Sequence, residues 1–551
     1  MTRKPLSAIG ELFILLKPFW PIVALSIALG ILGGFSVTVL LATINRALNS
    51  ENGLTQGVML AFAGLCLLSL VSAIISDMSS NAVGQKIIAQ LRKELGEKVL
   101  SAPIAQIERY RSHRLIPVLT HDIDTISDFS FAFAPLTISM TVTLGCLGYL
   151  ALLSWPLFVL MLLAMGIGIG AQVLARTRGI HGFEAAREAE DELQKHYHAI
   201  AQGAKELRIH RPRRHRMFTQ RIQQISDLIC ATQVKAVNTF ILAKTFGSTL
   251  FFIVIGLALL LENTWPSSDK AAMSGFVLVL LYMKGPLDHL VSVLPIISRA
   301  QIAFRRIAEL SEQFSSPEPH LLLSEQGAPQ QHIQSLELHN VQYSFPAVDG
   351  GEAFRLGPVN LTINQGDIVF IVGENGCGKT TLIKLLLGLY PPQTGEIRLN
   401  GEAVTAQTRD DYRQLFTTIF ADYYLFDDVV QGDTQIPADA TQYLERLEIA
   451  HKVSVRDGVF TTTDLSTGQR KRLALINAWL EQRPILVFDE WAADQDPTFR
   501  RIFYTELLPD LKRLGKTIIV ISHDDRYFDC ADQLVRMHSG KVMTQGQGQP
   551  A

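Results

Sequence analysis

The sequence predicts two parts of different fold class: a membrane α-helical bundle of six transmembrane helices, fused to an α/β domain with a phosphate-binding loop. Three observations carry this prediction. Long runs without charged side chains are confined to the first 300 residues, the composition changes after Phe314, and a buried-strand pattern then leads into a glycine-rich loop and a helix. The 551 residues carry a net charge of −2, are 48% apolar and include five cysteines, which excludes disorder, a disulfide framework and a nucleic-acid partner held by bulk charge.

Five charge-poor stretches predict the membrane spans. A bilayer core of ~30 Å requires ~20 apolar helical residues. The longest stretch is broken near its middle by Ser154, Trp155 and Pro156, so it predicts a helical hairpin, and six spans result. The stretches are residues 18–45, 52–76 and 129–175, with no charged residue, and 236–261 and 271–298, with isolated charges.

The connections predict the orientation. Residues 78–128 hold seven Lys/Arg and residues 176–235 hold twelve, whereas the opposite connections hold only Arg46 and Lys270. Because positive residues stay in the cytoplasm, both termini and both long loops are expected inside, and residues 18–45 are read as a retained anchor.

The two inner loops carry helical periodicity over residues 81–100 and 180–207, so helices are expected to project into the cytoplasm. We expect the turns at 102–111 and 206–216 to contact a cytoplasmic domain. Anionic lipid headgroups are an alternative contact for the basic residues of the second turn, Arg208, Arg211, Arg213, Arg214 and Arg216.

The sixth span holds two charges on one helix face, Lys284 and Asp288, with Gly285 and Pro286 between them predicting a kink. Lys284 would lie ~20 Å into the membrane, where exposure to lipid is costly. The pair is expected either to neutralise itself or to line a water-filled path for cargo.

The soluble half begins after a linker at residues 315–332 and occupies residues 333–551, with residues 1–314 as the membrane domain. A strand pattern at 367–372 leads into a complete phosphate-binding loop and then a helix. Lys379 is expected to reach the β and γ phosphates and Thr380 to ligate Mg²⁺. The loop residues are Gly373, Glu374, Asn375, Gly376, Cys377, Gly378, Lys379, Thr380 and Thr381.

A second buried strand, 484–488, ends in two carboxylates. Asp489 is placed to hold Mg²⁺ through water, and Glu490 to polarise an attacking water molecule. Between the two strands, Ser466, Gly468 and Gln469 open a helix whose N-terminus favours an anion.

Taken together, these motifs and their spacing resemble the ATPases of ABC transporters, with Thr467 in place of the usual first glycine of their signature sequence. With six spans ahead of it, the chain is similar to a type-1 ABC half-exporter whose cofactors are ATP and Mg²⁺. The resemblance implies that Glu490, His523 and Lys379 are catalytic, with His523 at the γ phosphate. It also implies that Tyr343 stacks on adenine and that Asp496 lies in a loop between subunits.

The sequence departs from the family at two positions. The family's glutamine should fall near Ala421, and Asp422 is the candidate to take over its contact with Mg²⁺ or water. Cys377 stands where the family usually has serine, through steric tolerance or as a thiol that makes the ATPase sensitive to alkylation.

The family resemblance also implies partners, location and cargo. ATP is sandwiched between two subunits, so a homodimer is expected, in the lipid bilayer of a bacterial inner membrane with the ATPase domain cytoplasmic and no nucleic-acid partner. Residues 420–423, 206–210 and 489–497 are similar to exporters of cyclic peptides and siderophores, such as those for pyoverdine precursors. A lipid or multidrug flippase, or a membrane ATPase sensor without transport, is the alternative.

Overall fold

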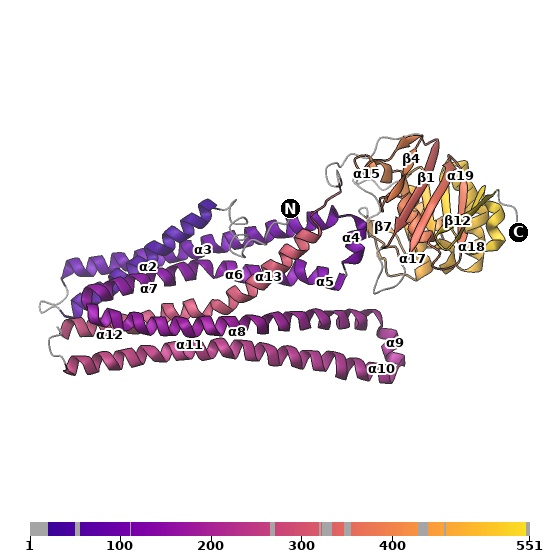
Figure 1. Cartoon of the computed structure of the whole chain (residues 1–551). Helices are drawn as coiled ribbons and strands as arrows, with labels where there is room; N and C mark the ends of the chain where they lie inside the picture. The colour runs from indigo at the N-terminus through magenta and orange to yellow at the C-terminus, as the bar shows by residue number, and fades with distance from the viewer. Residues whose placement is uncertain are drawn as a thin grey trace. The chain divides into compact units, whose positions relative to one another are not determined.

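The computed structural model describes residues 20–49, 55–110, 112–264, 270–318, 321, 333–345, 354–427, 439–456 and 459–546. The chain divides into two compact units. The first comprises Met1–Val99 and Glu108–Ser315, and the second comprises Leu100–Ile107 and Ser316–Ala551 (Figure 1).

The first unit is entirely helical where it is described. Six of its helical segments are long and apolar enough to cross a membrane, as the charge-free runs predict: Trp20–Leu48, Gln56–Leu100, Arg114–Leu153, Trp155–Gln202, Arg211–Leu260 and Met273–Gln313. Their helices are α2 (Trp20–Leu48), α3 (Gln56–Leu100), α5 (Ser112–Pro117), α6 (Ile123–Phe131), α7 (Phe133–Leu153), α8 (Trp155–Gln202), α9 (Ala204–Ile209), α10 (Arg211–Arg216), α11 (Gln224–Thr264), α12 (Lys270–Ser292) and α13 (Leu294–Gln313), with π-helical turns at Val118–Asp122 and Met217–Gln223.

Several helices are much longer than a bilayer requires. At 1.5 Å per residue, the 48 residues of α8 extend ~72 Å, against a hydrocarbon core of ~30 Å. Helices α8 and α11 run side by side (Figure 1). Beyond the apolar stretch, ion pairs join the helices: Arg187 and Arg306 both contact the buried Asp122, at 2.8 and 3.2 Å.

The predicted hairpin break is present, because α7 ends at Leu153 and Ser154 is extended before α8 begins. The predicted kink at Gly285 and Pro286 is not a helix boundary: α12 continues through Pro286, and the boundary with α13 falls at Val293. The proline at position 2 of α13 explains that boundary, since Pro295 cannot donate a hydrogen bond to the preceding turn.

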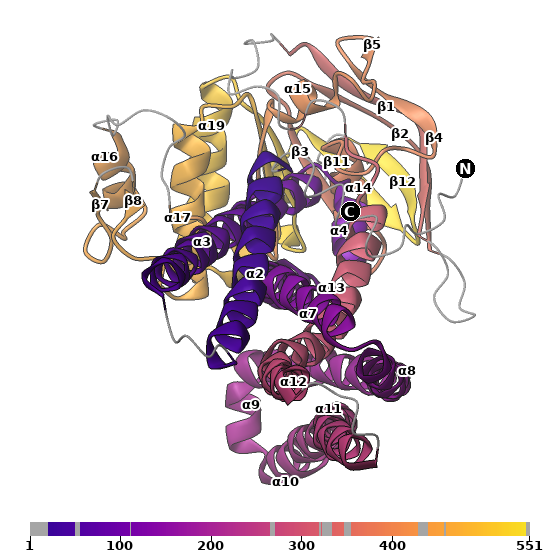
Figure 2. The same ribbon diagram turned by 90° about the vertical axis from the view of Figure 1, so that its left-hand side faces the viewer.

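The second unit is an α/β domain with two larger sheets, one of which is mostly parallel (Figure 2). The four-stranded sheet has the order β2-β1-β4-β5 and the six-stranded sheet the order β12-β11-β3-β10-β9-β6. The strands are β1 (Ser335–Ser344), β2 (Arg355–Asn364), β3 (Ile368–Gly373), β4 (Thr394–Leu399), β5 (Glu402–Ala403), β6 (Phe416–Ile419), β7 (Val455–Arg456), β8 (Val459–Phe460), β9 (Ile485–Asp489), β10 (Thr517–Ile521), β11 (Gln533–His538) and β12 (Lys541–Gly546). The helices are α14 (Lys379–Leu386), α15 (Arg409–Arg413), α16 (Asp439–Arg446), α17 (Thr467–Leu480), α18 (Pro497–Ile502) and α19 (Leu508–Arg513).

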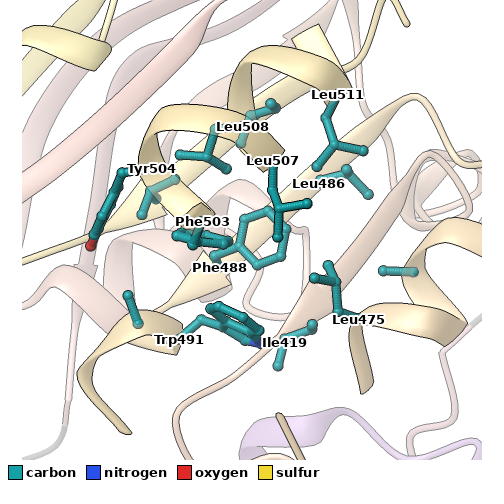
Figure 3. Packing of buried hydrophobic residues seen from close by; sticks show 14 of the residues in the cluster. Ile419, Leu475, Leu486, Phe488, Trp491, Phe503, Tyr504, Leu507, Leu508 and Leu511 are labelled. Carbon is teal, nitrogen blue, oxygen red and sulfur yellow. The ribbon is translucent and has the colours of Figure 1, made fainter. Parts of the chain in front are cut away.

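Strands β9 and β10 are buried along their whole length, which is why they read as continuous apolar runs. Alternate residues face two separate cores. On one face, Phe488 packs with Trp491 and Phe503 (Figure 3). On the other face, Val487 packs with residues of β1 and β2.

The turn after α3 belongs to the second unit. Ile104 and Ala105, at the start of α4 (Ile104–Arg109), pack against its core, and the Glu318 N–H donates to the Ser101 carbonyl at 2.7 Å. The first part of the turn at 102–111 therefore groups with the α/β unit.

Candidate active site

The candidate catalytic groups meet at one edge of the parallel sheet. Strand β10 lies between β3 and β9, and Ile521 is aligned with Ile371 on one side and with Asp489 on the other. Because parallel strands end at a common edge, the loops that follow all three strands converge there. These loops carry the phosphate-binding glycines, Glu490 and His523.

The phosphate-binding loop has the backbone that its glycines permit. Gly376 and Gly378 adopt φ of 80° and 105°, which side-chain-bearing residues rarely tolerate. The Lys379 ammonium donates to the carbonyls of Gly373 and Glu374, both at 3.0 Å, so it lies against the loop. Cys377 is 5% exposed and packs in the core, which argues against its reading as an accessible alkylation site.

The predicted magnesium ligands come together. The Thr380 hydroxyl donates to Asp489 Oδ2 at 3.3 Å. Burial raises the pKa of Asp489, and the charges of Glu490 and Asp422 raise it further, against hydrogen bonds from the Ala421 backbone and Thr380. This negative cluster around the buried Asp489 suits a divalent cation. No set of three His, Cys, Asp or Glu groups among the described residues is arranged to hold a metal ion, so nucleotide and water oxygens would complete its shell.

Glu490 lies beside His523, with Oε1 3.1 Å from the imidazole Nε2. Its backbone is in the left-handed region, at φ 50°, which is unfavourable for a glutamate and typical of functional sites. The sequence reasoning missed the residue that supports this conformation. The buried ammonium of Lys471 donates to the Glu490 carbonyl at 2.9 Å and pairs with Asp494 at 2.8 Å.

A signal for Lys471 exists in the sequence. It shares one face of α17 with Leu475 and Ala478, four and seven residues later, and all three are buried. A lone charge on an otherwise apolar helix face indicates a specific buried partner.

The signature residues cap α17. Ser466 and Gln469 form a reciprocal capping box, with two hydrogen bonds of 3.4 Å. The carbonyl of Gly468 accepts from the Gln495 side chain at 3.0 Å. Among the described residues, no hydrogen bond or ion pair joins Ser466, Gly468 or Gln469 to the phosphate-binding loop of the same chain.

Asp496 is engaged within its own domain. One carboxylate oxygen accepts from the Phe499 N–H at 2.9 Å and the other pairs with Arg472 at 2.7 Å. The Phe499 N–H, and then Arg472, hold the pKa of Asp496 below its usual value. The implied contact of Asp496 across subunits would have to compete with these two partners.

Tyr343 is poorly placed to stack on adenine. Its side chain is only 7% exposed, and its ring stacks on Tyr390 with centroids 4.9 Å apart. Phe345, on the same face at the end of the strand, is half-buried and is the better candidate. Its ring packs near Phe354, whose ring borders Gly378 of the phosphate-binding loop. The proline at position 346 marks the strand end, a signal that could have shifted the choice to Phe345.

The predicted ion pair between Lys284 and Asp288 is absent: among the described residues of α12, the Lys284 nitrogen is not within 4 Å of an Asp288 carboxylate oxygen. The Lys284 ammonium lies over the Phe252 ring, 4.7 Å from its centroid. Asp288 instead lines a cavity with Gln172 and Lys244. A self-neutralised pair is therefore the wrong reading of these two charges.

Comparison with known proteins identifies the family. Residues 20–283 match the family model "ABC transporter transmembrane region" and residues 356–493 match "ABC transporter". The ATP-binding protein SyrD of Pseudomonas syringae pv. syringae is 34% identical over 94% of this chain and 92% of its own length. The chain belongs to the ABC transporter family. An ATP-dependent lipid A-core flippase of Burkholderia orbicola is 24% identical over 99% of this chain and 95% of its own length.

Among solved structures, a bacterial Atm1-family ABC exporter with ATP bound has the same fold. Its TM-score is 0.76 at 17% identity, over 97% of this chain and 95% of that chain. This ABC protein thus has the type-1 exporter fold, and it is an ATP-binding ATPase coupled to transmembrane export. The predicted fold class and enzyme class are confirmed.

Proposed function

We propose that this ABC exporter moves a nonribosomal peptide, either a siderophore precursor resembling those of pyoverdine or a related cyclic peptide, from cytoplasm to periplasm across a bacterial inner membrane. The observation that carries the proposal is a cavity of the membrane unit, where Lys244 and Asp288 place both signs of charge in a lining that is otherwise mostly apolar. Such a space suits a peptide bearing both signs of charge better than a purely apolar drug. The resemblance of residues 206–210, 420–423 and 489–497 to peptide exporters supports the same cargo.

ATP hydrolysis follows from the geometry at the sheet edge. Lys379 would leave the loop carbonyls and bind the β and γ phosphates, and backbone amides of the loop would donate to the same phosphates. Glu490 would then orient and deprotonate the attacking water, while His523 holds the Glu490 carboxylate and contacts the γ phosphate. Lys471 positions Glu490 by donating a hydrogen bond to the backbone carbonyl of Glu490.

Thr380 and Asp489 would hold Mg²⁺, and Asp422, whose charge acts on Asp489, is the candidate to bind one of its waters. The ion would neutralise charge on the phosphates. We also propose a homodimer, because Ser466, Gly468 and Gln469 lie on a separate helix from the phosphate-binding loop of their own chain. A second copy would bring its signature helix to that loop and complete two ATP sites.

A direct test is to measure ATPase activity of the purified protein in lipid nanodiscs with acylated peptide precursor, lipid A or a hydrophobic drug. Peptide export predicts saturable stimulation by the precursor alone. Accumulation of the precursor in the cytoplasm of a deletion strain would exclude a sensor that does not transport. Stimulation by lipid A without any response to peptide would reject the proposed cargo.

A lipid flippase is the second candidate, because several relatives that cover most of this chain are named ATP-dependent lipid A-core flippases, at 24–25% identity. The relative at 34% identity, the ATP-binding protein SyrD, is not named as a lipid flippase, so the flippase stays the second candidate.

A further inference from the structure

A mostly apolar cavity with four polar lining residues lies among the helices of the membrane unit. It has a volume of about 80 Å³ and is lined by α8, α11 and α12, which lie together in Figure 2. Its polar lining residues are Gln172, Lys244, Ser248 and Asp288, and the remaining lining residues are apolar or glycine.

The three larger polar side chains lie at a common depth. Gln172 is 17 residues from the outer start of α8 at Trp155, Lys244 is 20 residues from the outer end of α11 at Thr264, and Asp288 is 18 residues from the outer start of α12 at Lys270. At 1.5 Å per residue these separations are ~26, ~30 and ~27 Å. Three helices thus bring polar groups to one level, towards the cytoplasmic side of a core ~30 Å thick.

These groups do not satisfy one another. Gln172 is 7% exposed, and its buried Oε1 has no hydrogen-bond partner. No ion pair within 4 Å joins Lys244 to Asp288 or either of them to another described residue, although both line the same space. Lys244 and Asp288 are half-buried, so the Gln172 Oε1 is the group whose missing partner is costly, and its convergence with two opposite charges indicates a ligand that supplies the missing contacts.

We infer that this cavity binds a zwitterionic end group of the transported molecule. Lys244 would hold its anionic oxygen, and Asp288 and the Gln172 carbonyl would accept from its ammonium. The volume equals a few water molecules, so it takes one end group and leaves the rest of the cargo in a larger space. The inference rests on the proposed peptide cargo, but a phosphatidylethanolamine headgroup has the same zwitterionic chemistry.

The test combines protein variants with capped ligands. The full-length protein is placed in phosphatidylglycerol nanodiscs, and its ATPase stimulation is measured with an acylated peptide whose C-terminal carboxyl is joined to the Nε of a lysine, so that the α-ammonium and α-carboxylate of this lysine form one free zwitterionic end group. Lys244→Gln, or amidation of the peptide carboxylate, should each raise the half-maximal peptide concentration about tenfold. The variant combined with the amidated peptide should raise this concentration no further, because the two changes remove the same interaction. Asp288→Asn and N-acetylation should behave in the same way.

Charge-preserving variants guard against misfolding: Lys244→Arg and Asp288→Glu should retain most of the stimulation. The matched controls Lys235→Gln and Asp227→Asn change exposed charges on α11 and should alter neither response. If the effects of the variant and of the cap on the half-maximal concentration multiply, the proposed site is wrong. Equal stimulation by capped and free peptide would also overturn it, and so would the absence of stimulation by any ligand.

The same assay with phosphatidylethanolamine in place of the peptide distinguishes a lipid headgroup from a peptide end group as the ligand. If only phosphatidylethanolamine stimulates, and this needs Lys244 and Asp288, the zwitterion site stands and peptide export is rejected. If its effect is independent of both residues, the zwitterion site is rejected as well.

Discussion

Glu490 sits between His523 and the end of β9, where a water molecule attacking a phosphate would pass. Glu490→Gln removes the charge but keeps the shape, and Lys379 and Asp489 are untouched. We expect ATP binding to persist and hydrolysis to fall by about 10²–10⁴-fold, the usual contribution of a general base. Equilibrium nucleotide binding and phosphate release measure the two effects. Lys379→Ala should instead lose nucleotide affinity, and near-normal turnover by Glu490→Gln would refute its role.

Lys471 is predicted to act through Glu490 without touching nucleotide. In Lys471→Met, the left-handed backbone of Glu490 loses its hydrogen bond, so kcat should fall about ten- to a hundredfold while KM for ATP changes little. Lys471→Gln keeps a donor and should recover part of the rate.

Lys516→Met is the matched control, because Lys516 also donates to two carbonyls, those of Gln482 and Arg483, at the opposite edge of the sheet. It should lower stability without lowering kcat. Equal kcat losses in the two lysine variants would reduce Lys471 to a purely structural residue.

Asp489 predicts a pH dependence of stability. Burial, followed by the Glu490 charge, raises its pKa in the folded protein. Protonated Asp489 contributes its full share to the stability of the folded protein below the pKa that it has in the unfolded chain, ~3.9. This contribution is lost as the pH rises through its pKa in the folded protein. At pH 7 in EDTA, Asp489→Asn should therefore unfold at a Tm about 2–4 °C above wild type, as for ~1 kcal/mol.

The Tm difference should shrink as the pH falls towards 4, and Mg²⁺ with ATP should reverse the order because wild type keeps its ion ligand. Scanning calorimetry measures both effects. An order of Tm values that is the same with and without Mg²⁺ would argue against Asp489 as a ligand.

At the scale of elements, the packing of α2 on α7 depends on glycines at close approach. A Cβ at Gly145 would lie 2.3 Å from the Thr38 hydroxyl oxygen, whereas one at Gly148 would meet nothing within 4 Å. Small residues allow membrane helices to approach closely. Gly145→Val should thus destabilise the membrane unit by about 1–3 kcal/mol, as overpacking does, and Gly148→Val should be tolerated. Thermal unfolding in detergent compares them, and equal Tm values would contradict this packing.

At the scale of the whole molecule, the dimer proposal predicts complementation. Lys379→Ala removes the phosphate-binding function and Ser466→Arg blocks the signature helix, so each homodimer should be inactive. In a mixed dimer, both changes fall in one ATP site and the other site is intact. Random pairing makes half of the dimers mixed, and each mixed dimer has one intact ATP site out of two. About a quarter of wild-type ATPase activity should therefore return on co-expression. Absence of any recovery would contradict ATP sites shared between subunits.

The two-part architecture, the six spans and the candidate motifs of the ATP site could all be predicted without the structure. Those signals are local: charge-free runs report contact with lipid, and the loop at 373–381 carries its own strand-loop-helix context. The pairing of Glu490 with His523 was not local, since 33 residues separate them, and parallel strands had to bring their ends together.

The partners of individual charges and rings, in contrast, could not be predicted and are seen only in the folded protein. Tyr343 and Phe345 both contact the Tyr390 ring, and burial distinguishes them, because Tyr343 is buried whereas Phe345 is half-buried. Lys284 and Asp288 are close in sequence yet reach different neighbours, Phe252 and the cavity of Lys244. Lys471 became visible through its contact with the Glu490 carbonyl. The physical reason is that helical or strand periodicity specifies a face, whereas the partner on that face comes from another element, whose position depends on the packing of the whole unit.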